Sequence, residues 1–541
     1  MLVTRNSKDS RNSRVAARSR GASASLSTAP LVVMAVALAA ISAAAVWEFY
    51  SRGHLLDYGD ALAHLNISRR IIDSRTPGPE QIGTVWLPLP HLLMLPFAAN
   101  DFLWRTGLAG SIPAAVCFFA AGLFLFAAAR RLFGGNAAGA AAALCFALNP
   151  NALYLQSIAM TEAFLFAALL GLLYFAVLFR QTQRFYAVVM AGAICCTATL
   201  VRYEGWFLIP FAAVFFFFTA RGRRLKAAAV FGCTASLGPL LWLAHNGYYY
   251  SNFLEFYNGP YSAKAIYQRA LDGGMARYPG DHDWTKAWLY FWSAAQLCLG
   301  RPLFWLGLAG VVAALFKRAW WALALLALPP LFYVLSLYSS STPIFVPHLW
   351  PNSYYNTRYG LAAFPFACLA AAAIVGMAPV RARKIVAAAV VLVSVSPWLM
   401  RPEAGGWVCW KESQVNSEAR RAWTHEAAAF FEANYRPGDG IFVSFGDLTG
   451  IFAEAGIPLR ETLHDGNGPL WLAATKRPDL FGWQQWAVAI SGDVVSNAIQ
   501  RVPPGRVSYV RVKTIKVKGA PAIEIYRRAK DRGEAAVTVR P

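Results

Sequence analysis

Two carboxylates and a histidine stand close together directly after the first long apolar run of the chain. Asp57 precedes Asp60 by three residues and His64 follows it by four, so Asp60 and His64 share one face in a helix. A carboxylate that is partly removed from water at a membrane surface can gain proton affinity, which suits a general base. Aspartate is also favoured as the N-cap of a helix, here 61–74, and one group can serve both purposes.

An apolar run broken by three prolines follows this segment. Residues 84–96 include Trp86 and His91. Each interior proline removes a backbone donor and kinks or ends a helix, so the run is a poor straight span. It suits a segment that lies along the membrane interface and closes a substrate cavity. An ordinary connection between two helices is the alternative interpretation.

Two arginines stand at the ends of apolar runs. Arg202 and Glu204 close one run, and Arg358 with Tyr359 opens a later one. The guanidinium group presents several donors in one plane and so suits a phosphate. Arg202 and Glu204 are also explained as a mutually neutralising pair. In the expected topology both arginines fall on the extracytoplasmic side, where the positive-inside rule does not explain a positive charge. We therefore interpret them as anchors for a lipid phosphate.

Glu162 stands where one apolar run ends and the next begins. Ionisable residues at the edge of a span usually face a cavity or a partner. Glu162 could therefore orient an acceptor or bind a metal ion together with Asp60. A simple helix cap is the third interpretation, and base rates favour it slightly.

The elements that position these residues are membrane helices. Hydrophobic residues make up 57% of the 541 residues, only 14% are charged, and the mean hydropathy is +0.40. We expect an α-helical polytopic membrane protein with about eleven spans. The expected spans are 31–47, 112–129, 137–155, 161–179, 185–201, 206–220, 226–246, 303–316, 319–337, 359–379 and 385–399. A cleaved signal peptide is the alternative for the first of them, but its length favours an uncleaved span.

The net charge is +22, and the placement of the lysines and arginines along the sequence predicts the orientation of the chain in the membrane. The lysines and arginines collect in short tracts between apolar runs, which is typical of cytoplasmic loops and argues against a nucleic-acid partner. These tracts lie at 130–131, 180–184, 221–226, 317–318 and 381–384. With a cytoplasmic N-terminus, they all fall inside. The candidate residues and the loops 48–111, 247–302 and 338–358 then fall outside.

Three regions follow from this layout. Residues 1–29 are basic and lack an apolar period, which indicates a disordered cytoplasmic tail. Residues 30–400 form the membrane domain, and 401–541 form a small extracytoplasmic α/β domain with a structural or acceptor-guiding role. Its expected strands are 441–445, 486–490, 507–512 and 523–526, with a helix at 448–455. Six of the eight cysteines lie in apolar runs, and the spacings indicate no disulfide framework.

The joint pattern resembles the GT-C glycosyltransferases, multispanning enzymes that use polyprenyl-phosphate sugars and include protein O-mannosyltransferases and lipid A aminoarabinose transferases. The resemblance rests on the acidic motif that leads from Asp60 into Ile-Ser-Arg69, on Glu162, and on Arg358-Tyr359. Their order and spacing match over about residues 30–400. A C-terminal outer domain is a common addition in this family.

The resemblance implies a catalytic role for Asp60, with Asp57 as a neighbouring candidate. Many relatives have Asp-Glu at this place, whereas Ala61 follows Asp60 here, so Asp57 or His64 would substitute for the second carboxylate. Members of the family differ in their need for a divalent metal ion. No cofactor is therefore certain, and a metal ion stays open.

The resemblance further implies a hexosyl- or pentosyltransferase that inverts configuration. The expected partners are a polyprenyl-phosphate sugar, a hydroxyl acceptor on a protein, glycan or lipid, and the bilayer. The alanine- and arginine-rich composition suggests a bacterial cytoplasmic membrane. A lipid or anion transporter and a non-catalytic scaffold are the alternatives. A transporter would show inverted repeats and charges in the middle of its spans, and neither pattern stands out in the sequence.

Overall fold

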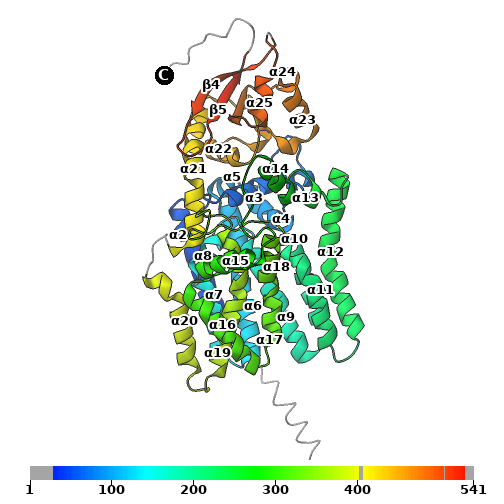
Figure 1. Ribbon diagram of the computed structural model, residues 1–541, viewed down its shortest axis with the longest axis vertical. Helices are drawn as coiled ribbons and strands as arrows, with labels where there is room; N and C mark the ends of the chain where they lie inside the picture. Colours follow the sequence, from blue (N-terminus) through cyan, green and yellow to red (C-terminus); the bar gives the residue numbers. More distant parts are fainter. Residues whose placement is uncertain (1–27, 401–405, 505, 530–541) are drawn as a thin grey trace, which may run out of the picture.

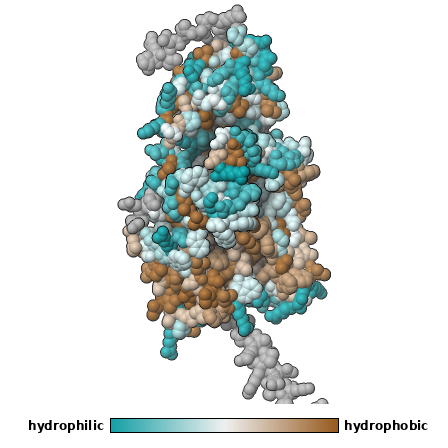
Figure 2. Space-filling model, viewed as in Figure 1, coloured by the Kyte–Doolittle hydropathy of each residue, from teal (hydrophilic) through white to brown (hydrophobic). Residues whose placement is uncertain are grey.

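The computed structural model describes residues 28–400, 406–504 and 506–529. A bundle of long helices forms the body, and the C-terminal domain covers one end of it (Figure 1). Hydrophobic side chains gather over the helical part of the face seen in Figure 2, whereas hydrophilic side chains cover the C-terminal domain. This distribution fits a membrane-embedded bundle with a domain in water. The disordered tail is expected over residues 1–29; residues 1–27 of it lie outside the described residues, and Ala29 already belongs to helix α2 (Ala29–Ser51).

Every expected span coincides with a helix or with two consecutive helices. Among the described residues, seven helices are long and apolar enough to cross a membrane. The number rises to nine if each of two sharply bent helix pairs is taken as one span. Helices α10 and α11 have 16 residues each, so the number eleven stays a prediction. The helices of the bundle are α2 (Ala29–Ser51), α6 (Leu108–Phe133), α7 (Asn136–Ala147), α8 (Pro150–Gln156), α9 (Glu162–Thr182), α10 (Tyr186–Val201), α11 (Glu204–Thr219), α12 (Arg224–Tyr250), α16 (Arg301–Phe316), α17 (Trp320–Leu326), α18 (Leu328–Tyr338), α19 (Phe364–Met377) and α20 (Arg383–Met400).

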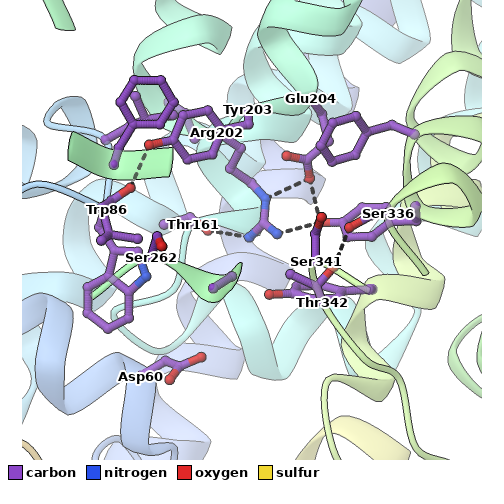
Figure 3. Close-up of a pocket in the computed structure, with 18 of the residues that line it drawn as sticks. Asp60, Trp86, Thr161, Arg202, Tyr203, Glu204, Ser262, Ser336, Ser341 and Thr342 are labelled. Atoms are coloured by element: carbon purple, nitrogen blue, oxygen red, sulfur yellow. Dashed lines mark hydrogen bonds and ion pairs between the residues drawn. The ribbon is translucent and has the colours of Figure 1, made fainter. Parts of the chain in front are cut away.

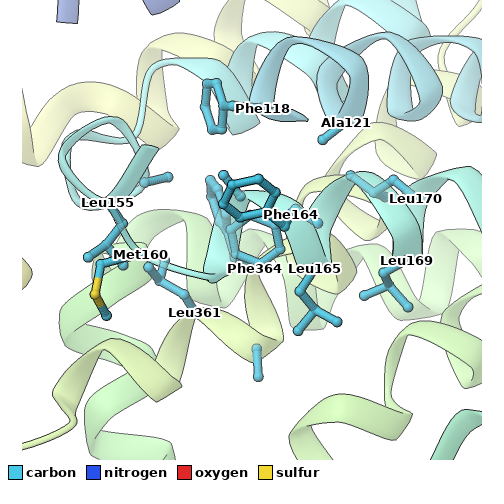
Figure 4. Packing of buried hydrophobic residues seen from close by; sticks show 14 of the residues in the cluster. Phe118, Ala121, Leu155, Met160, Phe164, Leu165, Leu169, Leu170, Leu361 and Phe364 are labelled. Atoms are coloured by element: carbon cyan, nitrogen blue, oxygen red, sulfur yellow. The ribbon is translucent and has the colours of Figure 1, made fainter. Parts of the chain in front are cut away.

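Close packing fixes these helices against one another. Phe118, Phe146 and Phe364 stack in a row with ring centroids 4.7 and 5.1 Å apart, and Figure 4 shows the surrounding apolar side chains. At Gly310 of α16, an added Cβ would come within 2.0 Å of the Ala370 carbonyl oxygen of α19, so only glycine allows this approach. The rigid bundle holds α9 and α19 in place, and both lead directly into the site described below.

Short helices cover the end of the bundle that faces the C-terminal domain (Figure 1). They are α3 (Gly59–Arg70), η2 (Pro79–Ile82), α4 (Leu89–Ala98), α5 (Asp101–Thr106), α13 (Glu255–Asn258), α14 (Ala263–Asp272), α15 (Trp284–Leu299) and η3 (Thr357–Ala363). Helix α4 has ten residues and so reaches about 15 Å, half of a bilayer core. The prediction that the proline-rich run is not a straight span is confirmed. In Figure 1, α13 and α14 lie between the bundle and the C-terminal domain.

The C-terminal domain is built on a five-stranded mixed sheet with the order β2-β1-β3-β5-β4. Four of its strands coincide with the predicted ones: β1 (Ile441–Val443), β3 (Trp486–Ile490), β4 (Tyr509–Ile515) and β5 (Ile523–Arg528). Strand β2 is Thr462–Leu463, and the helices are α22 (Gly450–Ala455), α23 (Pro469–Lys476), α24 (Pro478–Phe481) and α25 (Val494–Gln500).

A helix of 27 residues, α21 (Val408–Asn434), precedes this sheet and was not predicted. It buries polar side chains, including Glu412, Ser413, Ser417 and Arg420, against the outer loops and the bundle. The first half of its buried face is interrupted by these polar side chains, and a regular apolar stripe, with Trp423, Ala427 and Phe431, is present only in the second half.

Candidate active site

A cavity of about 470 Å³ lies at the end of the bundle nearest the C-terminal domain, beneath α14. Figure 3 shows Asp60 and Trp86 on one side of it and Glu204 and Ser336 on the other. Seven of the ten residues singled out from the sequence line the cavity. They are Asp60, His64, Trp86, Arg202, Glu204, Arg358 and Tyr359.

Asp60 faces the cavity from the first turn of α3. The N-cap position belongs to Tyr58, so the capping interpretation of Asp60 is wrong. Its Oδ2 instead accepts a hydrogen bond from Nη2 of Arg358 at 2.6 Å. The Asp60 side chain keeps 40% exposure, whereas that of Arg358 keeps 5%. A substrate in the cavity can therefore reach the carboxylate.

Arg358 lies at the start of η3 and joins three segments of the chain. Its Nε donates to Oε1 of Glu162 at 3.2 Å, and its Nη1 donates to the Tyr58 hydroxyl at 2.5 Å. The guanidinium group also stacks 4.8 Å from the ring centroid of Tyr359. Together with Asp60, these contacts use all three nitrogens of the guanidinium group.

Arg202 is held in a similar way beside the same cavity (Figure 3). Its Nε donates to Glu204 at 2.8 Å, its Nη1 to Thr161 at 2.6 Å, and its Nη2 to the hydroxyl of Tyr333. The neutralising pair expected for Arg202 and Glu204 is present. Glu162 Oε1 lies 3.3 Å from Arg202 Nη1 as well, so this carboxylate bridges both arginines. Its role is thus wider than that of a helix cap.

The two histidines form a buried pair beside Asp60. Nδ1 of His64 and Nε2 of His91 are 2.8 Å apart, and the His64 ring packs 4.2 Å from that of Trp86. His64 contacts the cavity, and His91 stands behind it. Burial, aided by the positive charges of the two arginines, lowers the pKa of His64 to about 3. His64 is therefore neutral at physiological pH.

We expect the protein to lose stability on acidification, because His64 is buried in its neutral form. The pKa of His64 is about 3 in the folded protein and 6.5 when unfolded, so only the unfolded state gains a proton between these values. The contribution of the neutral His64 to the free energy of unfolding is complete above pH 6.5. It is lost as the pH falls, by about 2 kcal/mol at pH 5. We expect the melting temperature to fall less between pH 7 and pH 5 in His64→Gln than in the wild type. The exposed His348→Gln should behave as the wild type, and equal slopes for all three would contradict a buried neutral His64.

Asp57 is not brought to the cavity. Its carboxylate is buried in a separate pocket of about 350 Å³ between the outer loop and α21. There it lies 2.8 Å from Nδ1 of His54 and 3.6 Å from Nη1 of Arg421. The expectation that Asp57 stands beside Asp60 at the site is therefore wrong, because the chain turns between them and directs the two carboxylates into different pockets.

Several residues at or beside the cavity were missed from the sequence. Lys264 of α14 lines it next to Ser262, and no carboxylate of a described residue pairs with this lysine. A lysine in a loop on the predicted outer face has no topological purpose, and this signal could have revealed it. Tyr58 and Tyr333 carried no recognisable signal, and Glu412 was hidden in the unpredicted helix α21.

A metal site would require several His, Cys, Asp or Glu side chains to lie close together. In the parts of the chain that the structure describes, no three His, Cys, Asp or Glu side chains group as metal ligands. The guanidinium group of Arg358 contacts both Asp60 and Glu162, the pair expected to share a metal ion. The requirement for a divalent ion stays an untested expectation.

Comparison with known proteins confirms the GT-C resemblance at the level of the fold. Residues 103–246 match the family model of dolichyl-phosphate-mannose-protein mannosyltransferases. The structure of ArnT from Cupriavidus metallidurans bound to undecaprenyl phosphate is similar with a TM-score of 0.54 and 16% identity, covering 92% of this chain and 98% of that one. The apo structure of that ArnT gives 0.50 and 13%, covering 89% and 98%. No curated protein matches the sequence. The protein thus has the fold of the GT-C membrane glycosyltransferases.

Proposed function

We propose that this protein is a membrane glycosyltransferase that moves a sugar from a polyprenyl-phosphate donor to an acceptor hydroxyl on the extracytoplasmic face. One observation carries the proposal. Asp60 and Arg358, 298 residues apart in sequence, meet at 2.6 Å on the wall of a cavity that has room for a sugar phosphate. The family match and the ArnT-like fold, with ArnT itself bound to undecaprenyl phosphate, support a lipid-phosphate donor.

In this proposal, Asp60 accepts the proton of the acceptor hydroxyl as that oxygen attacks the anomeric carbon. The bond from this carbon to the phosphate oxygen breaks on the opposite side, so the configuration inverts. The phosphate leaves with its negative charge, so fixed positive charge stabilises the transition state more than a general acid does. Trp86 and Tyr359 offer aromatic faces for the sugar ring.

We further propose that Lys264 binds the donor phosphate in addition to the arginines expected from the sequence. Asp60, Glu162 and Glu204 already neutralise Arg202 and Arg358. A donor phosphate therefore needs a further cation, and Lys264 is a cation of the lining without a described carboxylate partner. We place the phosphate between Lys264 and the Arg358 edge of the cavity, with the lipid leading away toward the bilayer.

Removal of this charge should weaken lipid-phosphate binding by roughly 10- to 100-fold, the worth of a charge-assisted hydrogen bond. The experiment measures the Kd of undecaprenyl phosphate for the full chain in nanodiscs by a titration of tryptophan fluorescence. Lys264→Gln should bind weakly. Lys286→Gln is the matched control, because Lys286 stands in the same outer loop but pairs with Asp283 at 3.4 Å. Absence of specific binding by the wild type would overturn the proposed function itself.

A further inference from the structure

The C-terminal domain reaches into the proposed site through one carboxylate of α21. Glu412 is 1% exposed, so it is enclosed by the protein. The hydroxyl of Tyr58 donates a hydrogen bond to its Oε1, and the backbone N–H of Thr357 donates to its Oε2 at 2.9 Å. Nη1 of Arg358 lies 3.9 Å from Oε1. The two carboxylate oxygens of Glu412 thus hold Tyr58 and Thr357. These residues stand close in sequence to Asp60 and Arg358, which line the cavity.

The two residues that Glu412 contacts stand at the starts of the segments that carry Asp60 and Arg358. Tyr58 is the N-cap residue of α3, whose first turn carries Asp60. Thr357 is the first residue of η3, and Arg358 follows it. The first N–H groups of a helix lack partners within the helix, so a buried acceptor at this end fixes where the helix begins. Glu412 therefore sets the starts of both segments relative to each other.

We propose that Glu412 is a positioning residue that aligns Arg358 with Asp60, so that the C-terminal domain completes the catalytic site. The inference rests on the proposed function and deepens it. Glu412 does not line the cavity, and it acts through Tyr58, Thr357 and Arg358.

Other contacts anchor α21, which separates positioning from a purely structural role. Asn151 Oδ1 accepts a hydrogen bond from the Cys409 backbone N–H at 2.9 Å, and the Tyr154 hydroxyl donates to Ser413 at 2.7 Å. Arg420 Nη2 donates to the backbone oxygen of Asp57 at 2.5 Å. The helix stays docked through these bonds when Glu412 is replaced, so a local effect on η3 is expected rather than release of the domain.

Hydrogen exchange of the full chain in nanodiscs tests the positioning role without knowledge of the substrate. In Glu412→Ala, the Thr357 amide should exchange at least tenfold faster than in the wild type, while amides of residues 423–434 keep their rates. Glu412→Gln retains one acceptor oxygen and should show a smaller increase, which keeps the test valid if the alanine variant folds poorly. Glu418→Gln is the matched control, an exposed carboxylate on the same helix, and should match the wild type. Unchanged exchange at Thr357 in both Glu412 variants overturns the proposal.

The same variants test the catalytic consequence. Sugar transfer is measured in cells that carry each variant, and the Kd is measured in nanodiscs. Glu412→Gln should lower the rate of sugar transfer at least tenfold while its Kd for undecaprenyl phosphate stays within about threefold of the wild type. A merely structural defect would lower the rate and the fraction of protein that binds lipid together. Faster exchange at Thr357 with wild-type transfer would overturn the proposal. Failure of the wild type to bind the lipid, with faster exchange still present, would instead reject the proposed function and leave the structural link standing.

Discussion

Replacing Asp60 by asparagine should stop sugar transfer and leave the protein folded. Asparagine keeps the size of the side chain and an oxygen that can accept the hydrogen bond from Arg358, but it cannot take a proton from an acceptor hydroxyl. Loss of a positioned general base costs a factor of about 10²–10⁴ in rate. Mass spectrometry of lipids extracted from cells that carry only the variant should show accumulation of one polyprenyl-phosphate sugar, which would also identify the donor.

Asp57→Asn provides the comparison within the same motif. Because the Asp57 carboxylate lies in the separate pocket beside α21, this variant should retain transfer. Transfer by Asp60→Asn at the wild-type rate would remove Asp60 from its role. Loss of transfer in Asp57→Asn alone would move the base to Asp57.

Substitution of Arg358 should have the second large effect, on stability as well as on transfer. In Arg358→Met, the buried carboxylate of Glu162 loses one of its two cations, and Glu412 and Asp60 lose theirs. Breaking a buried ion pair from one side costs about 3–5 kcal/mol, because the remaining charge stays buried. A fall in the melting temperature of the detergent-solubilised protein should report this loss, together with the absence of transfer.

Two further variants separate charge from geometry. Arg358→Lys keeps the charge, but one ammonium cannot contact Asp60, Glu162 and Tyr58 together, so the protein should be more stable than Arg358→Met and still transfer poorly. The double variant Arg358→Met with Glu162→Gln should recover part of the lost stability, since it removes a buried charge. A melting temperature of Arg358→Met equal to that of the exposed control Arg277→Lys would contradict the ion-pair network.

The sequence was sufficient to find most of the charged residues of this site. Glu162, Arg202 and Arg358 stand at the ends of apolar runs, and Asp60 lies in the acidic segment after the first run; a charge is conspicuous there, and its side of the membrane follows from the basic tracts. For the same reason, the positions of the membrane helices were predictable. The number of spans was less so, because helices as short as α10 and α11 leave the crossing of a bilayer undecided.

Tertiary contacts decide what the sequence left open. Asp57 and Asp60 are three residues apart and chemically alike, and the turn of the chain between them directs their carboxylates into different pockets. Glu412 lies in the first half of α21, where polar side chains interrupt the buried face, so no regular apolar pattern indicated that part of the helix. Lys264 lies in the short helix α14, and only the fold brings that helix over the cavity.

The most direct measurement is a structure of the full chain in nanodiscs with undecaprenyl phosphate, determined by electron cryomicroscopy. We expect the phosphate in the cavity lined by Lys264 and Arg358, with the Asp60 carboxylate facing the space where the sugar of a donor would lie. A phosphate bound elsewhere, with Asp60 beyond the reach of a sugar attached to it, would contradict the account.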